Sequence, residues 1–275
     1  MSVTSAAVGE LFEEFERDVP NVIDELSPDE EWAHQVPEAY FASGQWAFRR
    51  IKLAMLAAGI STFENILDLP SGYGRVLRVL KAAFPDATLT ACDIHAPAVD
   101  FCARVFGATP VYSTERPEEI PLEGPFDLLW CGSLLTHVDK PEWDSFLQCF
   151  QSVLRPGGLL VFTTTGPFVA EEQIHSSDSP YGITAEQRDS IVKSYRETGF
   201  GYCDYEYGDH LRDISLPPNY GIALASPKWV CTKLEPRKFD LLTYSAGGWG
   251  SRWGEFRPSL ATAAQDVIGC IRTVD

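Results

Sequence analysis

Apolar runs alternate with amphipathic segments through the middle of the chain. Short buried runs rich in Leu, Ile and Val predict strands, and apolar residues at three- and four-residue spacing predict helices. The predicted strands are 64–69, 87–93, 108–112, 125–131 and 157–164, and the helices between them are 75–84, 97–106 and 142–154. Strands that alternate with helices predict a doubly wound α/β fold with a parallel sheet, in which ligands bind beyond the carboxyl ends of the strands.

The pattern changes on both sides of this region. Before it, 8–17 and 37–58 show helical spacing, so residues 1–62 are expected to form a helical leader. After it, the expected elements are a helix at 185–198, short strands at 200–207 and 220–225, a helix at 227–234 and core strands at 239–244 and 266–271. The last two strands complete a seven-stranded, mostly parallel sheet whose final strand is antiparallel.

Three parts of the chain follow from these elements. Residues 63–165 and 226–275 are expected to form one domain, with the leader at 1–62 packed against it. The segment 166–225 is too long for a plain connection, and long ordered insertions in compact domains are usually functional. We expect it to be a lid over the acceptor side of the site.

The segment between the first strand and its helix contains Asp68-Leu69-Pro70-Ser71-Gly72-Tyr73-Gly74. Glycines at 72 and 74 permit a sharp turn and leave room for a ligand that a Cβ would exclude. Asp68 ends the strand, where its carboxylate can accept hydrogen bonds from a cationic or hydroxylated ligand. An ordinary strand-to-helix turn is the alternative. Leu77 stands where the dinucleotide fingerprint has its third glycine, which counts against a pyrophosphate ligand.

The next strand ends in a second acid, Asp93, about twenty residues after the glycines. A carboxylate at this place can bind the two hydroxyls of a ribose. The alternative role is an N-cap for the helix that begins near Pro97, for which Asp is a good residue. Together the strand, glycine turn, helix, strand and acid form a complete βαβ unit and predict a nucleoside site.

At this point the chain resembles the class I S-adenosylmethionine-dependent methyltransferases over about residues 40–165. Four motifs occur in the order and spacing of that family. They are Ile66-Leu67-Asp68-Leu69-Pro70-Ser71-Gly72-Tyr73-Gly74, Cys92-Asp93-Ile94, Phe126-Asp127-Leu128-Leu129-Trp130-Cys131-Gly132-Ser133-Leu134-Leu135-Thr136-His137-Val138 and Leu154-Arg155-Pro156-Gly157-Gly158-Leu159-Leu160-Val161-Phe162.

The resemblance implies S-adenosylmethionine as cofactor and S-adenosylhomocysteine as product. It assigns cofactor binding to Asp68, Pro70, Ser71, Gly72, Gly74, Asp93, Ile94, Ser113, Thr114, Cys131, Gly132 and the leader residue Tyr40. The chain departs from the family at two places. Pro70-Ser71 replaces the Gly-Cys or Gly-Ser of many members, and Ser113-Thr114 stands where many carry an Asp that binds the adenine amino group.

Candidates for catalysis and acceptor binding are less sharply defined. His137 stands where the family commonly has a His, so it is expected to anchor the cofactor loop first and to act as a base second. The expected lid is rich in aromatic residues, and His210, next to Asp209, is its candidate general base. Tyr207, Tyr220 and Trp249 are the candidate acceptor contacts. Core packing is the alternative for each aromatic residue, and a plain surface turn at 247–250 is the alternative for Trp249.

Composition narrows the function further. The formal charge is −17, which disfavours nucleic acid and anionic membranes as partners. The longest apolar runs are too short for a membrane span, the first residues are acidic where a signal peptide is basic, and the seven scattered cysteines are typical of buried thiols in a reducing cytoplasm. No metal site is expected, and oligomeric state is left open.

The expected function is methyl transfer to a small-molecule oxygen or nitrogen acceptor, such as a natural product or a sugar. Methyl transfer from a sulfonium needs no protein nucleophile, so the missing Ser/His/Asp or Cys/His set is no argument against an enzyme. Two alternatives remain at this stage: an NAD-linked oxidoreductase, and a non-catalytic member of the fold that binds the nucleoside.

Overall fold

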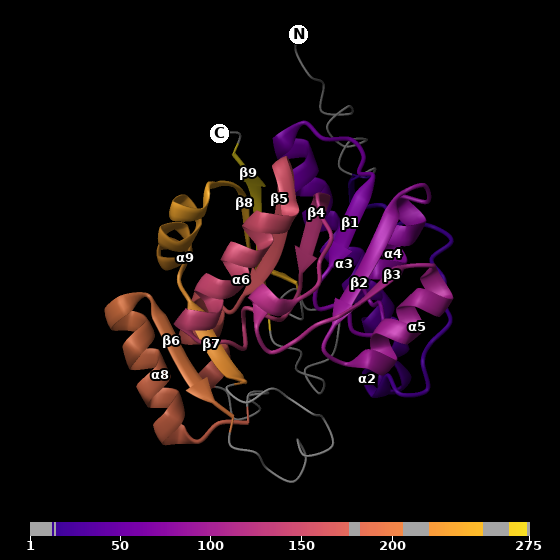
Figure 1. Ribbon diagram of the computed structural model, residues 1–275. Coiled ribbons are helices and arrows are strands. Elements are labelled where there is room, and N and C mark those ends of the chain that lie inside the picture. Colours follow the sequence, from indigo (N-terminus) through magenta and orange to yellow (C-terminus); the bar gives the residue numbers. More distant parts are fainter. Residues whose placement is uncertain (1–12, 14, 176–181, 206–219, 250–263, 274–275) are drawn as a thin grey trace.

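Seven strands form one twisted sheet in the order β3-β2-β1-β4-β5-β9-β8 (Figure 1). The computed structural model describes residues 13, 15–175, 182–205, 220–249 and 264–273. The strands are β1 (Asn65–Asp68), β2 (Thr88–Asp93), β3 (Thr109–Tyr112), β4 (Phe126–Cys131), β5 (Leu154–Thr164), β8 (Phe239–Trp249) and β9 (Gln265–Arg272). β9 lies antiparallel between β5 and β8, and the other pairs are parallel. The predicted seven-stranded sheet with an antiparallel final strand is confirmed.

Helices cover both faces of this sheet, and the strand sequences show why. Neighbouring residues such as Ile66 and Leu67 point to opposite faces, and both are fully buried. One face packs on α3 (Pro37–Ala58), α4 (Leu77–Ala83) and α5 (Ala96–Phe106), and the other on α6 (Lys140–Val153) and α9 (Pro227–Leu234). The apolar runs of the sequence are therefore strands buried on two sides.

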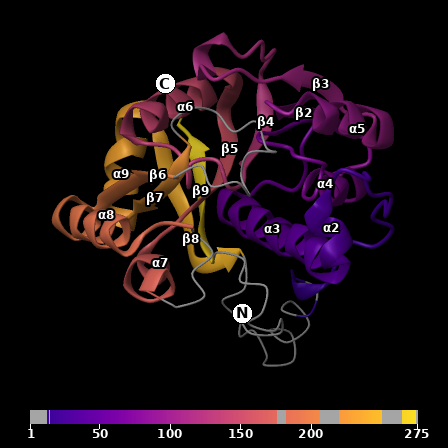
Figure 2. The same ribbon diagram turned by 90° about the horizontal axis from the view of Figure 1, so that it is seen from below.

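The leader helix α3 occupies the predicted residues because both of its ends are encoded locally. Pro37 takes the first helical position, where its missing N–H costs nothing, and Gly59 ends the helix with φ +68°. A short helix, α2 (Glu31–Gln35), precedes it. Figure 2 shows α2 and α3 side by side next to α4. The helix predicted at 8–17 lies mostly outside the described residues.

The described residues of the segment 166–225 form a small layer beside the sheet (orange in Figure 1). It contains α7 (Pro167–Glu171), a 3-10 turn (Gln173–His175), α8 (Ala185–Thr198) and the antiparallel pair β6 (Phe200–Asp204) and β7 (Gly221–Ala225). β7 joins the main domain by backbone hydrogen bonds to Thr136, His137 and Thr165, in the loops that follow β4 and β5. The inserted segment is thereby attached to the carboxyl edge of the sheet.

The surface turn predicted at 247–250 is wrong for 247–249, and Gly250 lies outside the described residues. β8 continues through Trp249, and the predicted surface turn is an irregularity within this strand. Gly247 has φ +57° and donates its N–H to Asp266 at 2.7 Å, so the local twist is fixed from β9. This long-range contact explains why the glycines do not end the strand.

Two features of composition can be compared with the structure. All seven cysteines are free thiols, and five of them are buried, at positions 92, 102, 131, 149 and 270. Among the described residues, none of the helices combines the length and apolarity that crossing a bilayer requires.

Candidate functional site

The glycine turn and the end of β2 are joined by one carboxylate. Asp93 Oδ2 accepts the backbone N–H of Gly72 at 2.8 Å, and Oδ1 accepts that of His95 at 2.9 Å. Asp93 is not the N-cap of α5, since that position is His95 and has no side-chain cap; one carboxylate oxygen instead binds the glycine turn and the other binds the chain entering α5. The carboxylate is buried, which raises its pKa, and the two backbone donors oppose that shift. Its remaining lone pairs can still accept from ligand hydroxyls.

The two glycines of the turn have different physical requirements. Gly72 has φ +47° and open space where a Cβ would stand. Gly74 has φ +77°, and its Cβ would lie 2.3 Å from the Phe106 ring. Gly74 is therefore required for packing on α5, whereas the empty space beside Gly72 is available to a ligand.

Asp68 ends β1 as a buried carboxylate. It is 1 % exposed, and neither oxygen has a hydrogen-bond partner among the described residues. Its pKa is raised well above the usual value, first by burial and then by the negative charge of Asp93. The Arg75 cation and the nearby backbone N–H of Leu77 lower that pKa in part. A buried carboxylate without a partner is costly, so this position favours a ligand that brings a cation or several donors.

Tyr40 and Arg78 support the glycine turn from behind. The Tyr40 hydroxyl donates to the Tyr73 carbonyl at 3.5 Å. Arg78, 1 % exposed, donates to the carbonyls of Gly74 at 3.2 Å and Ile23 at 2.8 Å. Its guanidinium also lies over the rings of Tyr40 and Phe106. The cation is thus satisfied by backbone carbonyls and ring faces, and it links the turn to the N-terminal segment.

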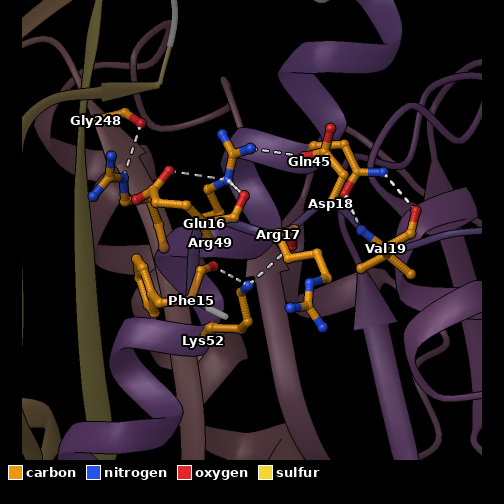
Figure 3. A network of polar contacts seen from close by, with 10 residues as sticks. Phe15, Glu16, Arg17, Asp18, Val19, Gln45, Arg49, Lys52 and Gly248 are labelled. Carbon is orange, nitrogen blue, oxygen red and sulfur yellow. Dashed lines mark hydrogen bonds and ion pairs between the residues drawn. The ribbon is translucent and has the colours of Figure 1, made fainter. Parts of the chain in front are cut away.

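That N-terminal segment, residues 15–25, forms a strap whose first part, Phe15 to Val19, lies along α3 (Figure 3). Three side chains at helical spacing on α3 hold its backbone. Gln45 makes paired bonds with the N–H and carbonyl of Val19, both at 3.0 Å. Arg49 donates to the Glu16 carbonyl at 3.1 Å and pairs with Asp18 at 2.7 Å, and Lys52 donates to the Phe15 carbonyl.

Arg75 connects three parts of the chain that are distant in sequence. Its guanidinium lies 5.0 Å from the Trp32 ring centroid and 4.5 Å from that of Trp249. Trp249 is 5 % exposed and donates its indole N–H to the Ser43 carbonyl at 2.9 Å. The sequence placed Trp249 at a pocket rim, but it lies in the core beside the residue that follows the glycine turn.

The end of β3 lies beside Asp93 on the sheet. Ser113 donates its backbone N–H to the Asp93 carbonyl at 2.8 Å, and its half-buried hydroxyl donates to the Thr114 carbonyl at 3.3 Å. The Thr114 hydroxyl is used locally, by donation to the Arg116 carbonyl at 2.8 Å. Ile94 exposes 42 % of its surface next to Asp93. An apolar side chain and a free serine lone pair are therefore available at this end of the crevice.

The loop after β4 is held in an unusual conformation. Cys131 is fully buried, and a Cβ on Gly132 would lie 2.9 Å from the Trp130 indole nitrogen. Ser133 has φ +62°, a left-handed value that is uncommon for a residue with a side chain. Its backbone N–H donates to Thr163 Oγ1 at 2.7 Å, which fixes the turn to β5.

His137 anchors the same loop to β7. Its Nδ1 lies 2.8 Å from the Gly221 carbonyl, and its ring stacks on Tyr220 with centroids 4.5 Å apart. Burial lowers the pKa of His137 to about 4, so the imidazole is neutral at physiological pH. The Tyr205 hydroxyl lies 3.3 Å from Nδ1. Tyr220 thus lies against the candidate histidine, whereas His210 and Tyr207 are outside the described residues.

Sequence reasoning missed Arg78, Ser133 as an individual residue, and Gln265. Arg78 carries a local signal, because it is a charged residue on an apolar helix face three positions after Arg75. Gln265 carries none. Its contact is the Ser133 hydroxyl, 132 positions away, which accepts from its amide at 2.9 Å.

Comparisons with known proteins agree with this geometry. A family model described as a methyltransferase domain matches residues 66–158, which contain the glycine turn, Asp93 and the His137 loop. A malonyl-[acyl-carrier protein] O-methyltransferase of Laribacter hongkongensis is 32 % identical over 120 residues, 39 % of each chain. The N-methyltransferase FrzE of Cladobotryum is 25 % identical over 191 residues, 60 % of this chain and 63 % of that protein. The chain thus spans less than two thirds of either relative.

Solved structures share the fold. An S-adenosylmethionine-dependent methyltransferase from Clostridium acetobutylicum superposes with a TM-score of 0.56 at 12 % identity, over 89 % of this chain and 98 % of that one. A Burkholderia thailandensis 1,6-didemethyltoxoflavin-N1-methyltransferase, with S-adenosylhomocysteine bound, gives 0.52 at 15 % identity, over 91 % and 92 %. Motifs, family model and fold coincide on the same residues. Residues 66–158 match the methyltransferase-domain family, and the chain shares the fold of solved S-adenosylmethionine-dependent methyltransferases.

Proposed function

We propose that the protein transfers the methyl group of S-adenosylmethionine to an oxygen or nitrogen atom of a small molecule, such as a natural product or a sugar. The observation that carries the proposal is the buried, unpartnered Asp68 carboxylate beside the turn that Asp93 holds open at Gly72. A nucleoside that carries cationic groups as well as ribose hydroxyls can satisfy Asp68 with the former and Asp93 with the latter.

Residue roles follow from these positions. Asp68, Pro70, Ser71, Gly72 and Gly74 form the wall for the methionine half of the cofactor. For the other half, Asp93 binds the ribose, Ile94 covers one face of the adenine, and the ends of β3 and β4 complete the pocket. These last positions are Ser113, Thr114, Cys131 and Gly132. In this proposal Tyr40 supports cofactor binding indirectly, because its hydroxyl donates a hydrogen bond to the Tyr73 carbonyl and so holds the glycine turn.

Catalysis then depends on position more than on a protein nucleophile. When bound, S-adenosylmethionine supplies an electrophilic methyl group on its sulfonium. The protein holds the acceptor in line with that group, and such alignment lowers barriers by up to about 7–11 kcal/mol in well-oriented systems. His137 is neutral and anchors the loop, so any proton transfer to its Nε2 passes through Ser133, whose hydroxyl lies 3.4 Å away.

We propose a small acceptor because of the net charge of the protein and because the segment 166–225 lies at the edge of the sheet. The net charge of −17 repels polyanions such as nucleic acid. The segment 166–225 adjoins the sheet edge through β7, where it can cover an acceptor, and its described aromatic contacts at His137 are Tyr205 and Tyr220. His210 and Tyr207 remain predictions for the same segment.

Calorimetry and a turnover assay test this proposal. The folded protein is titrated with S-adenosylhomocysteine and S-adenosylmethionine, and micromolar binding is expected. Release of S-adenosylhomocysteine is then followed across panels of phenols, amines and sugars. If neither nucleoside binds, the proposal fails. Binding without turnover on any panel instead supports a non-catalytic nucleoside-binding protein.

A further inference from the structure

A chain of hydrogen bonds crosses the carboxyl edge of the sheet from β7 to β9. His137 Nδ1 lies 2.8 Å from the Gly221 carbonyl oxygen. The Ser133 hydroxyl lies 3.4 Å from His137 Nε2 and 2.9 Å from the Gln265 side-chain nitrogen. Four residues from β7, the loop after β4 and β9 therefore form one connected line.

Chemistry fixes the direction of each bond in this line. A carbonyl oxygen only accepts, so His137 Nδ1 must carry the proton that faces Gly221. The ring is neutral because burial lowers its pKa to about 4, and Nε2 therefore carries a lone pair. Ser133 must then donate its hydroxyl proton to Nε2. With that proton used, the serine oxygen is left as an acceptor.

The orientation of the Gln265 amide follows from this direction. Its NH₂ group must face Ser133, because a flipped amide would set its carbonyl against a serine oxygen that has no proton to give. The carbonyl oxygen Oε1 consequently points away from Ser133. It is buried, and among the residues described in the structure it has no hydrogen-bond partner. The whole Gln265 residue is 7 % exposed.

Gln265 is placed between the cofactor turn and the His137 loop. It opens β9 and pairs in register with Trp249, whose ring lies against Arg75 after the glycine turn. Its other contact, Ser133, follows β4. Methyl acceptors must reach the cofactor at this same edge of the sheet, because ligands of doubly wound folds bind beyond the carboxyl ends of the strands.

We propose that Gln265 Oε1 accepts a hydrogen bond from the N–H or O–H group that is to be methylated, which makes Gln265 a specificity-determining residue. The inference rests on the proposed methyl transfer and narrows its acceptor. A neutral amide carbonyl orients a donor without removing its proton, and it leaves the lone pair of the acceptor atom free to face the methyl group. Amines, amides and hydroxyls satisfy this carbonyl, whereas a carboxylate without a proton is repelled by it.

Sinefungin provides a probe that does not require the acceptor to be known. This analogue carries an amine where the cofactor carries its methyl group, so it presents N–H donors at the acceptor side. S-Adenosylhomocysteine has no group there. Calorimetry with both ligands is carried out on wild type and on Gln265→Leu. We expect sinefungin to bind at least about tenfold more weakly to the variant, with the affinity for S-adenosylhomocysteine changed by less than about threefold.

Two further variants control for packing. Gln173→Leu removes another glutamine, whose amide oxygen accepts the N–H of Ala264 next to Gln265. This variant should change the affinities for the two ligands by the same factor. Ser133→Ala removes the group that orients the Gln265 amide and should give an intermediate loss for sinefungin alone. If thermal melting shows Gln265→Leu to be unfolded, Ser133→Ala and Gln265→Asn carry the test.

The outcomes separate this inference from the function beneath it. If wild type binds neither ligand, the proposed function fails and the inference falls with it. If wild type binds S-adenosylhomocysteine but the variants weaken both ligands equally, or neither, the inference alone is overturned. A selective loss for sinefungin supports it.

Discussion

Asp93 and Gly72 are joined by a 2.8 Å hydrogen bond from the glycine N–H to the carboxylate. The residue proposed to bind the ribose therefore also sets the shape of the turn that receives the cofactor. The Asp93 side chain thus couples the two halves of the site, and a substitution at either residue should alter both the turn and the ribose contact.

Replacing Asp93 tests this coupling. Asp93→Ala removes the proposed ribose acceptor and the partner of Gly72, so S-adenosylhomocysteine affinity should fall by about tenfold or more. Asp93→Asn keeps an oxygen for Gly72 and should lose less. Titration calorimetry measures both. Equal affinities for Asp93→Ala and wild type would show that the nucleoside binds elsewhere.

The two glycines of the turn should respond differently to substitution. Gly74→Ala places a Cβ 2.3 Å from the Phe106 ring at φ +77°, so it should lower the free energy of unfolding by about 2 kcal/mol or more. A Cβ at Gly72 meets no atom within 4 Å, so the side chain of Gly72→Val is expected to fill the space left for the ligand. It should weaken S-adenosylhomocysteine binding strongly, with a smaller loss of stability from its φ of +47°. Urea unfolding and calorimetry distinguish the two; the reverse ranking would contradict this assignment.

His137 should give the protein a pH-dependent stability. Its folded pKa is lowered to about 4, whereas an unfolded histidine titrates near 6.5. As pH falls below about 6.5, His137 binds a proton in the unfolded chain but not in the folded protein. The free energy of unfolding therefore decreases until about pH 4.

The measurement is urea unfolding of wild type and His137→Asn between pH 7.5 and pH 5. The difference in slope between the two proteins should approach about 1.4 kcal/mol per pH unit at its steepest, since other titrating groups are common to both. Parallel curves would mean that the pKa of His137 is not lowered by folding.

Arg78 should hold the N-terminal strap far more strongly than the surface ion pair nearby. Arg78→Met removes buried bonds to the carbonyls of Ile23 and Gly74, and should lower the free energy of unfolding by about 2–4 kcal/mol. Arg104→Met is the matched control, because it removes an exposed pair with Glu25 and the contact of its exposed side chain with the Phe101 ring, and it should cost less than about 1 kcal/mol. Limited proteolysis within 15–25 should be faster in Arg78→Met. A similar response in both variants would argue that the buried Arg78 does not hold the strap.

Much of the fold could be predicted because its signals are local. α3 and α9 have the predicted ends, set by Pro37 with Gly59 in one case and by Ser226 with Pro227 in the other. The acids Asp68 and Asp93 end buried strands as predicted, although β1 and β2 are shorter than the predicted 64–69 and 87–93. Strand periodicity and turn chemistry act over a few residues, so a single sequence reveals them.

The site was only partly predictable for the opposite reason. Trp249 was assigned to a rim, but Arg75 and Ser43 place it in the core, and both contacts span more than 170 positions. The strap was not predicted at all, because Gln45, Arg49 and Lys52 look like an ordinary polar helix face until its partners are known. Contacts of this range leave no pattern in the neighbouring sequence.

The sequence by itself determined the doubly wound sheet, the glycine turn and the two carboxylates that favour a sulfonium nucleoside over a dinucleotide. Hydrophobic periodicity and glycine chemistry are properties of short segments, which is why they were sufficient. Only the tertiary structure decided that Asp68 has no hydrogen-bond partner among the described residues, that burial lowers the pKa of His137 and that the amide nitrogen of Gln265 faces Ser133. Burial and hydrogen-bond direction arise when distant strands meet at one edge, and they exist only in the folded chain.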